Sequence, residues 1–180
     1  MRMFAISVLI TFAILLTGCG ELLTTEPLAT KDDKLFDAAL IGTWSDQDDS
    51  VITVTSEKKP VYDILYIGTE KGNKLQLSGQ LVQIGDEQIL DVCDAEGGLF
   101  SIRGHVWIRI QKKGTGLQIQ YLDSKWLQDK ARQSGLPLFT ADSHPVLTAT
   151  TEKLRQFVKQ FGTQPEARGG NLDLVPFKKK

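Results

Sequence analysis

Short segments with alternating apolar residues, separated by turns, are the feature that most limits how this chain can fold. Apolar side chains occupy every second position over 106–110 and again over 117–121. Period two places them on one face of a strand. The turn sequences Gly85-Asp86 and Gly114-Thr115 separate such runs, and glycine accepts the positive φ of a two-residue hairpin. The sequence therefore predicts a mainly β fold, an antiparallel barrel or sandwich.

Two helices interrupt or close this series. The first is predicted after Asp123, which can cap it, and ends at Gly135. The second follows the capping residue Thr150 and ends at Gly162. Its apolar residues fall at i, i+3, i+4 and i+7, which predicts an amphipathic C-terminal helix packed on the sheet. A helix lying on a membrane surface is the alternative. The apolar stripe consists of Leu154, Phe157, Val158 and Phe161.

The first residues have the pattern of an export signal. Arg2 precedes an uncharged run over 4–16, which is shorter than the roughly 20 residues that span a bilayer. The run ends in Leu16-Thr17-Gly18-Cys19, which resembles the lipobox of bacterial lipoproteins. That resemblance implies cleavage before Cys19 and attachment of lipid to its sulfur. Gly20, instead of the aspartate that retains lipoproteins in the inner membrane, implies an outer-membrane protein facing the periplasm.

The remaining chain length suits one domain. We predict a signal peptide over 1–18, a flexible tether over 19–34, a β-barrel domain with its C-terminal helix over 35–162, and a loose tail over 163–180. The tether is rich in Glu, Thr, Asp and Lys and lacks periodicity. The whole chain has 21 Lys and Arg against 22 Asp and Glu, without a basic stripe, so nucleic acid is not expected as a partner.

Ile41-Gly42-Thr43-Trp44 resembles the Gly-x-Trp opening of lipocalin-like proteins. The resemblance rests on Gly42, Trp44 and the strands and late helix that follow. It implies an up-and-down antiparallel barrel, lipocalin-like, in which Trp44 packs into the closed end. The Thr-Asp-Tyr motif of the family is missing from this sequence.

Few residues suggest catalysis. His105 and His144 are the two histidines, and Asp142-Ser143-His144 are too close in sequence for a triad, whose members converge from separate segments. Cys93 lies in a strand-like run, where we expect a small buried side chain. The acidic residues of the turns are expected to be solvated; they are Asp46, Asp48, Asp49, Asp91, Asp94 and Glu96. Neither zinc-ligand spacing nor a phosphate-binding glycine loop is present.

We therefore expect a non-enzymatic, lipid-anchored envelope lipoprotein that needs no cofactor or metal. Its partners would be the membrane, through lipid on Cys19, and a small apolar ligand inside the barrel. Three alternatives stay open: a barrel interior that is simply filled, a structural or interaction module that docks to another envelope protein, and an unrecognised hydrolase. The residues expected to face the ligand cavity or core are Trp44, Leu75, Leu77, Leu81, Trp107, Leu117, Ile119 and Tyr121.

Overall fold

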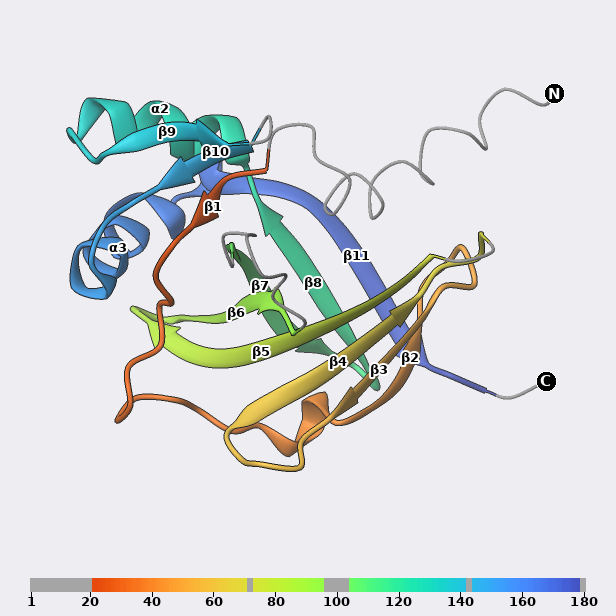
Figure 1. The fold of residues 1–180 in the computed structure, drawn as a ribbon. Coiled ribbons are helices and arrows are strands. Elements are labelled where there is room, and N and C mark those ends of the chain that lie inside the picture. The colour runs from red at the N-terminus through yellow and green to blue at the C-terminus, as the bar shows by residue number, and fades with distance from the viewer. Residues whose placement is uncertain (1–20, 71–72, 96–103, 142–143, 179–180) are drawn as a thin grey trace, which may run out of the picture.

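A computed structural model describes residues 21–70, 73–95, 104–141 and 144–178, and the predicted signal peptide and Cys19 lie outside these ranges. The described residues form a closed antiparallel barrel of eight strands, in agreement with the predicted mainly β, lipocalin-like architecture (Figure 1). Consecutive barrel strands are neighbours, and β6–β7 pairing closes the ring. The strands are β2 (Gly42–Ser45), β3 (Val51–Thr55), β4 (Val61–Ile67), β5 (Lys74–Ile84), β6 (Glu87–Asp94), β7 (His105–Lys113), β8 (Gly116–Leu122) and β11 (Arg168–Pro176).

Two-residue turns fix the register of two hairpins, as predicted. In the β5–β6 hairpin Ile84 pairs with Glu87, and the intervening Gly85 has a φ of 61°. Gly114 has a φ of 62° in the equivalent position between β7 and β8. Side chains other than glycine are disfavoured at such positive φ values. The turns therefore hold each wall of the barrel in the register that places alternate residues inside.

The N-terminal end of β2 is covered by a short 3-10 helix, η1 (Ala38–Leu40). The indole Nε1 of Trp44 donates a hydrogen bond to the carbonyl oxygen of Leu40 at 3.1 Å. Phe36 stacks on Tyr62 with ring centroids 5.6 Å apart. Trp44 thus packs at the barrel end that η1 covers, which we call the plugged end; the opposite end is called the far end.

The chain between β8 and β11 forms a cover on the outside of the barrel (Figure 1). Both predicted helices are present, capped by Asp123 and Thr150. The apolar side of the second helix is buried, which is the predicted docking rather than the membrane-surface alternative. The cover contains α2 (Ser124–Gln133), β9 (Leu138–Ala141), β10 (His144–Leu147), α3 (Thr151–Phe157), the π-helix η2 (Val158–Gly162) and the 3-10 helix η3 (Pro165–Ala167).

The predicted loose tail over 163–180 is wrong for most of its length, because 165–167 form η3 and 168–176 form β11, the eighth barrel strand. β11 pairs with β8 on one side and β2 on the other. Glycine permits this close approach: a Cβ on Gly116 would lie 2.1 Å from the carbonyl oxygen of Leu174. Only Leu172 and Leu174 give β11 an inward apolar pattern. Its pairing with β8 and β2, more than its own periodicity, therefore determines that this segment is a strand.

The predicted flexible tether is also wrong over the described part, 21–34. β1 (Leu23–Thr24) pairs with β10 and with β7, and Leu28 is fully buried. The Leu28 amide donates to Asp91 Oδ2 at 2.5 Å, and Arg155 pairs with Asp33 at 2.5 Å. Such contacts link positions more than 60 residues apart, which periodicity along the sequence cannot reveal. The folded domain therefore includes residues 21–34 and does not begin at 35.

Two apolar clusters lie on opposite faces of the barrel wall. The first, the outer layer, lies between the outer faces of β5 to β8 and the cover. It includes Leu28, Val82, Trp107, Leu127 and Leu154. The second cluster, the barrel interior, lies within the ring of strands. The candidate site lies in that interior.

Candidate functional site

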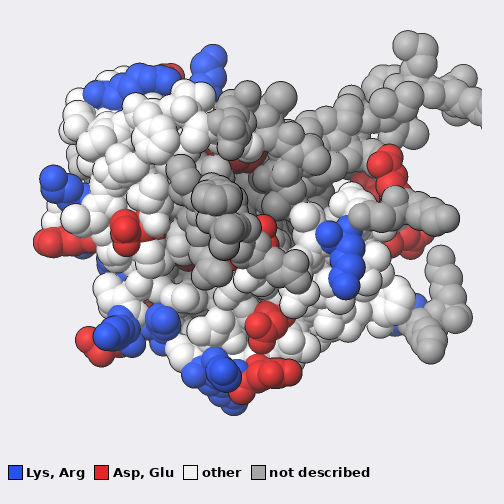
Figure 2. Space-filling view, viewed as in Figure 1, with Lys and Arg blue, Asp and Glu red and all other residues white. Residues whose placement is uncertain are grey.

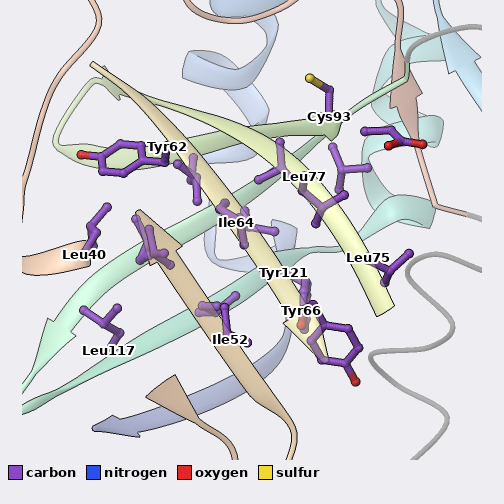
Figure 3. Close-up of a pocket in the computed structure, with 18 of the residues that line it drawn as sticks. Leu40, Ile52, Tyr62, Ile64, Tyr66, Leu75, Leu77, Cys93, Leu117 and Tyr121 are labelled. Atoms are coloured by element: carbon purple, nitrogen blue, oxygen red, sulfur yellow. The ribbon is translucent and has the colours of Figure 1, made fainter. Parts of the chain in front are cut away.

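The barrel encloses a partly open cavity of about 300 Å³. Alternate residues of every barrel strand point into it, because successive strand side chains face opposite sides. Figure 3 shows Ile52, Ile64 and Leu77 lying toward this space from three different strands. The described lining residues of the barrel strands are Trp44, Ile52, Val54, Tyr62, Ile64, Tyr66, Leu75, Leu77, Leu90, Val92, Cys93, Asp94, Val106, Ile108, Ile110, Leu117, Ile119, Tyr121 and Leu174.

Six of the eight residues expected at the cavity or core line the cavity: Trp44, Leu75, Leu77, Leu117, Ile119 and Tyr121. Leu81 is fully buried in the same interior but does not border the cavity. The volume falls at the lower end of the range typical of small-molecule pockets, about 300 to 1,000 Å³. A void of this size distinguishes this barrel from one whose interior is filled by its own side chains.

The inward orientation expected for Trp107 is wrong. Trp107 alternates with Val106 and Ile108, which line the cavity, so it points outward into the outer layer. It is buried there because the cover and residues 21–34 pack over it. The large apolar surface of Trp107 correctly suggested a buried position. It did not show on which side of the barrel wall the side chain lies. The parity of β7 alone would have indicated the outward direction.

Leu23 and Leu174 were missed as cavity residues because their segments were predicted to be tether and tail. Both line the cavity, Leu23 from β1 and Leu174 from β11. Tyr66 and Ile52 could have been found, since the β-branched and aromatic residues over 61–67 and 51–55 are typical of strands, and one face of each strand must turn inward. The sequence does not show which face of each strand turns inward, because that depends on the segments that cover the outside of the barrel.

The plugged end and the far end differ in polarity. Leu40, Trp44 and Tyr62 lie at the plugged end, where the Tyr62 hydroxyl accepts a hydrogen bond from the Asp37 amide at 2.7 Å. Asp94, Gly104 and His144 line the far end, where β6, β7 and β10 meet the space. His144 was expected in a loop, but it is the first residue of β10. Polar atoms therefore gather mainly at the far end.

The side chain of Tyr121 borders this space (Figure 3). Its side chain is 9% exposed, and the hydroxyl has no hydrogen-bond partner within the described ranges. Burial raises the pKa of this hydroxyl, and the nearby Tyr66, Glu21 and Asp46 raise it further. Tyr121 therefore keeps its proton at neutral pH. Its hydroxyl can both donate and accept a hydrogen bond.

Acidic groups outnumber basic ones around the far end. Among the described lining residues Asp94 is acidic, and none is Lys or Arg. Burial raises the pKa of Glu21, as does the nearby Asp123. Asp46 accepts hydrogen bonds from the Asp48 and Ser50 amides, each at 2.9 Å, so this carboxyl holds a turn. The described lining thus contains one carboxyl group, that of Asp94, and one imidazole, that of His144, and no Lys or Arg.

A second grouping of chemistry-bearing side chains, beside the cavity, joins β6 and β7. His105 Nδ1 lies 2.8 Å from Asp91 Oδ1, and Cys93 is the cross-strand partner of His105. Asp91 is 3% exposed and was wrongly expected in a solvated turn. Because Asp91 also accepts from the Leu28 amide, the pair fixes residues 21–34 against the barrel. Cys93 is half-buried instead of buried.

Neither a membrane-spanning helix nor a metal site emerges from the described ranges. No helix there has the length and apolarity needed to cross a bilayer. Likewise, no three His, Cys, Asp or Glu side chains in those ranges gather closely enough to hold a metal ion. On the face seen in Figure 2, Lys and Arg side chains are interspersed with Asp and Glu.

Comparison of the chain with models of protein families, with curated proteins and with solved structures gave no match.

Proposed function

We propose that this protein is a non-enzymatic lipoprotein of the cell envelope that holds a small apolar ligand inside its barrel. The observation that carries the proposal is the partly open cavity of about 300 Å³, lined almost throughout by apolar and aromatic side chains. Such a lining favours an apolar ligand because burial removes its surface from water, at about 25 cal/mol per Å².

The anchor belongs to the same proposal. Lipid on Cys19 would attach the chain to a membrane, and Gly20 favours the outer membrane with the domain in the periplasm. Residues from Glu21 onward already belong to the folded domain, so the attachment point lies close to the barrel in sequence. Cells fed labelled palmitate should incorporate label into the wild-type chain and not into Cys19→Ser. Equal labelling of both proteins would contradict the anchor.

Ligand carriage is tested by filling the cavity. The protein is extracted from its host membrane, and small molecules that remain bound are identified by native mass spectrometry. Leu77→Trp places a larger side chain in the cavity and should abolish the bound mass. Val175→Trp adds the same side chain on an exposed strand position, 56% exposed in the wild type, and should retain the ligand. Repeated absence of bound ligand from the wild-type protein would contradict the proposal.

The non-enzymatic part of the proposal is supported by the surroundings of the two histidines. His105 is held by Asp91, which is itself tied to the Leu28 amide, so the pair serves to fix a segment. Asp142 and Ser143 lie outside the described residues. A panel of ester and glycoside substrates should show no turnover that depends on His144. Loss of a measurable turnover in His144→Ala would instead favour the hydrolase alternative.

A docking module is the second candidate, and the edge strand β9 favours it. β9 pairs with β10 on one side, and its other edge has no strand partner within the described ranges. Phe139 on this strand is 41% exposed. Open edges and exposed aromatic residues can accept a strand from another protein. Crosslinking in intact cells from position 140, an exposed residue beside Phe139 on β9, should capture one specific envelope protein, and Phe139→Lys should remove it.

A further inference from the structure

A second pocket, of about 550 Å³, lies on the outer side of the barrel and is lined by the tip of the β5–β6 hairpin and by residues of β7, β8 and β11. Gln111 in this lining follows Ile110, which borders the inner cavity, so the Gln111 side chain faces outward. We call this pocket the polar groove. Its described lining includes six carboxamide side chains, those of Gln83, Gln88, Gln111, Gln118, Gln120 and Asn171.

Side-chain hydrogen bonds hold several of these amides in fixed orientations. Arg109 forms an ion pair with Glu87. The Nη1 atom of Arg109 donates to Gln120 Oε1 at 3.0 Å, and Gln120 Nε2 donates to Asn171 Oδ1 at 2.9 Å. Arg109, Gln120 and Asn171 lie in register on neighbouring strands, so they form one polar row across the barrel wall. Groups that are already ordered lose less conformational entropy when a ligand binds them.

A second row runs beside the first. Gln111 Nε2 donates to Gln118 Oε1 at 2.6 Å, and Gln118 Nε2 donates to Asp173 Oδ1 at 2.8 Å. An amide nitrogen carries two protons and an amide oxygen accepts two hydrogen bonds. After the bonds that the described residues make, Gln118 and Gln120 therefore each keep one donor and one acceptor. Both side chains are half-buried, and those of Gln111 and Asn171 are exposed, so another molecule can reach this surface.

The composition of the polar groove excludes several classes of ligand. Ile110 is the only apolar residue of the described lining, so a lipid or an aromatic compound would find little apolar surface there. Two Arg residues of the described lining, Arg109 and Arg168, are balanced by Asp86 and Glu87. The groove thus has no excess positive charge that would attract a polyanion. Rows of groups that both donate and accept suit a neutral molecule rich in hydroxyl groups.

We propose that the polar groove binds a short segment of a neutral polysaccharide, whose hydroxyl or acetamido groups replace water on the two rows of amides. Neighbouring strands are about 4.8 Å apart, so each row presents its polar groups at intervals comparable with the length of one sugar ring. This site goes beyond the proposed function, because it lies on the opposite side of the barrel wall from the cavity. The two sites can therefore be occupied at once.

The test titrates the whole protein, held in a detergent without a sugar headgroup, with trisaccharides and a short peptide. Cellotriose and tri-N-acetylchitotriose are the neutral probes, trigalacturonate is the anionic probe, and tetra-alanine is the peptide probe. Binding is followed by NMR through the side-chain amide signals of Gln118 and Gln120. The neutral trisaccharides should shift these signals and bind at least about 3-fold more tightly than trigalacturonate, whose carboxylates lose more solvation. Tetra-alanine should not shift them.

Gln118→Leu removes the central amide of one row and nearly preserves the size of the side chain. It should weaken binding of both neutral trisaccharides by about 3- to 10-fold, the effect of one neutral hydrogen bond. Gln111→Leu, at an exposed position of the same row, should weaken binding in the same direction. Gln76→Leu is the matched control, since Gln76 is an exposed strand residue outside the polar groove. It should leave the affinity unchanged, and thermal unfolding shows that each variant is folded.

The inference fails if neither neutral trisaccharide binds, or if Gln118→Leu and Gln76→Leu weaken binding equally. It also fails if trigalacturonate or tetra-alanine binds more tightly than the neutral sugars, because the groove would then recognise an anion or a peptide. Binding of the neutral fluorophore N-phenyl-1-naphthylamine in the cavity is measured beside each titration. The trisaccharides should not displace it. A protein that binds the sugars but not the fluorophore would contradict the proposed function alone.

Discussion

The barrel wall formed by β5 to β8 carries apolar residues on both faces, and the two faces are covered in different ways. On the outer face, side chains from α2, α3 and residues 21–34 pack against Val82, Ile89 and Trp107. On the inner face, strand side chains face one another across a cavity. The same alternating pattern thus produces a packed layer outside and a binding space inside. Packing density, more than residue type, distinguishes stabilising residues from those available to a ligand.

The largest expected effect comes from breaking the polar contact at the edge of the outer layer. Asp91→Ala removes the partner of both His105 and the Leu28 amide. Removing one member of a buried pair leaves the others unsatisfied, and we expect the free energy of unfolding to fall by about 3 to 5 kcal/mol. Denaturant unfolding measures this loss. Asp129→Ala, at an exposed pair with Arg132, should cost about 0.5 kcal/mol or less.

A matched pair of leucine truncations tests the two faces directly. Leu154 is fully buried in the outer layer, and Leu154→Ala should lower the free energy of unfolding by about 2 to 5 kcal/mol. Leu77 is half-buried and already borders a void, so Leu77→Ala should cost only about 1 kcal/mol. Denaturant unfolding of both variants gives the difference. Equal losses would mean that the interior is packed as densely as the outer layer.

Closure of the interior by β11 gives the next effect in size. In Gly116→Ala the new methyl group would collide with the Leu174 carbonyl, which must force β8 and β11 apart. We expect a loss of about 1 to 3 kcal/mol and faster hydrogen exchange over 168–176. Gly114→Ala, where a Cβ meets no atom within 4 Å, is the control. It should carry only the positive-φ penalty of about 1 kcal/mol. Unchanged exchange in Gly116→Ala would contradict closure by this strand.

The interior was more predictable from sequence than the cover of the outer layer. The bounds of strand β4 can be inferred from sequence, because Pro60 and Gly68 delimit a short run rich in β-branched and aromatic residues. The helix after Thr150 was recognisable from its cap and its apolar spacing. These signals are local, and each segment carries its own pattern.

The errors occur where distant partners determine the structure. β11 is held by cross-strand amide contacts, such as Gln120 Nε2 to Asn171 Oδ1 at 2.9 Å, which leave no apolar period to read. Residues 21–34 fold because Asp91 and Arg155 bind them. Trp107 is a different case, because the parity of β7 alone would have indicated its outward direction. Sequence also could not show that the Tyr121 hydroxyl has no hydrogen-bond partner among the described residues.

The smallest expected effect is local and concerns the N-terminal segment near the far end of the interior. Because burial and then Asp123 raise the pKa of Glu21, its protonated form is favoured when the segment is packed. The packed state is therefore most stable below the unfolded pKa of about 4.3. It loses stability as pH rises through the higher folded value. Hydrogen exchange over 21–24 should accelerate across that pH interval, and Glu21→Gln, which carries no titratable group, should remove the dependence. A wild-type segment whose exchange, corrected for the intrinsic pH effect, stays constant would show that Glu21 is ionised without cost to the packed state.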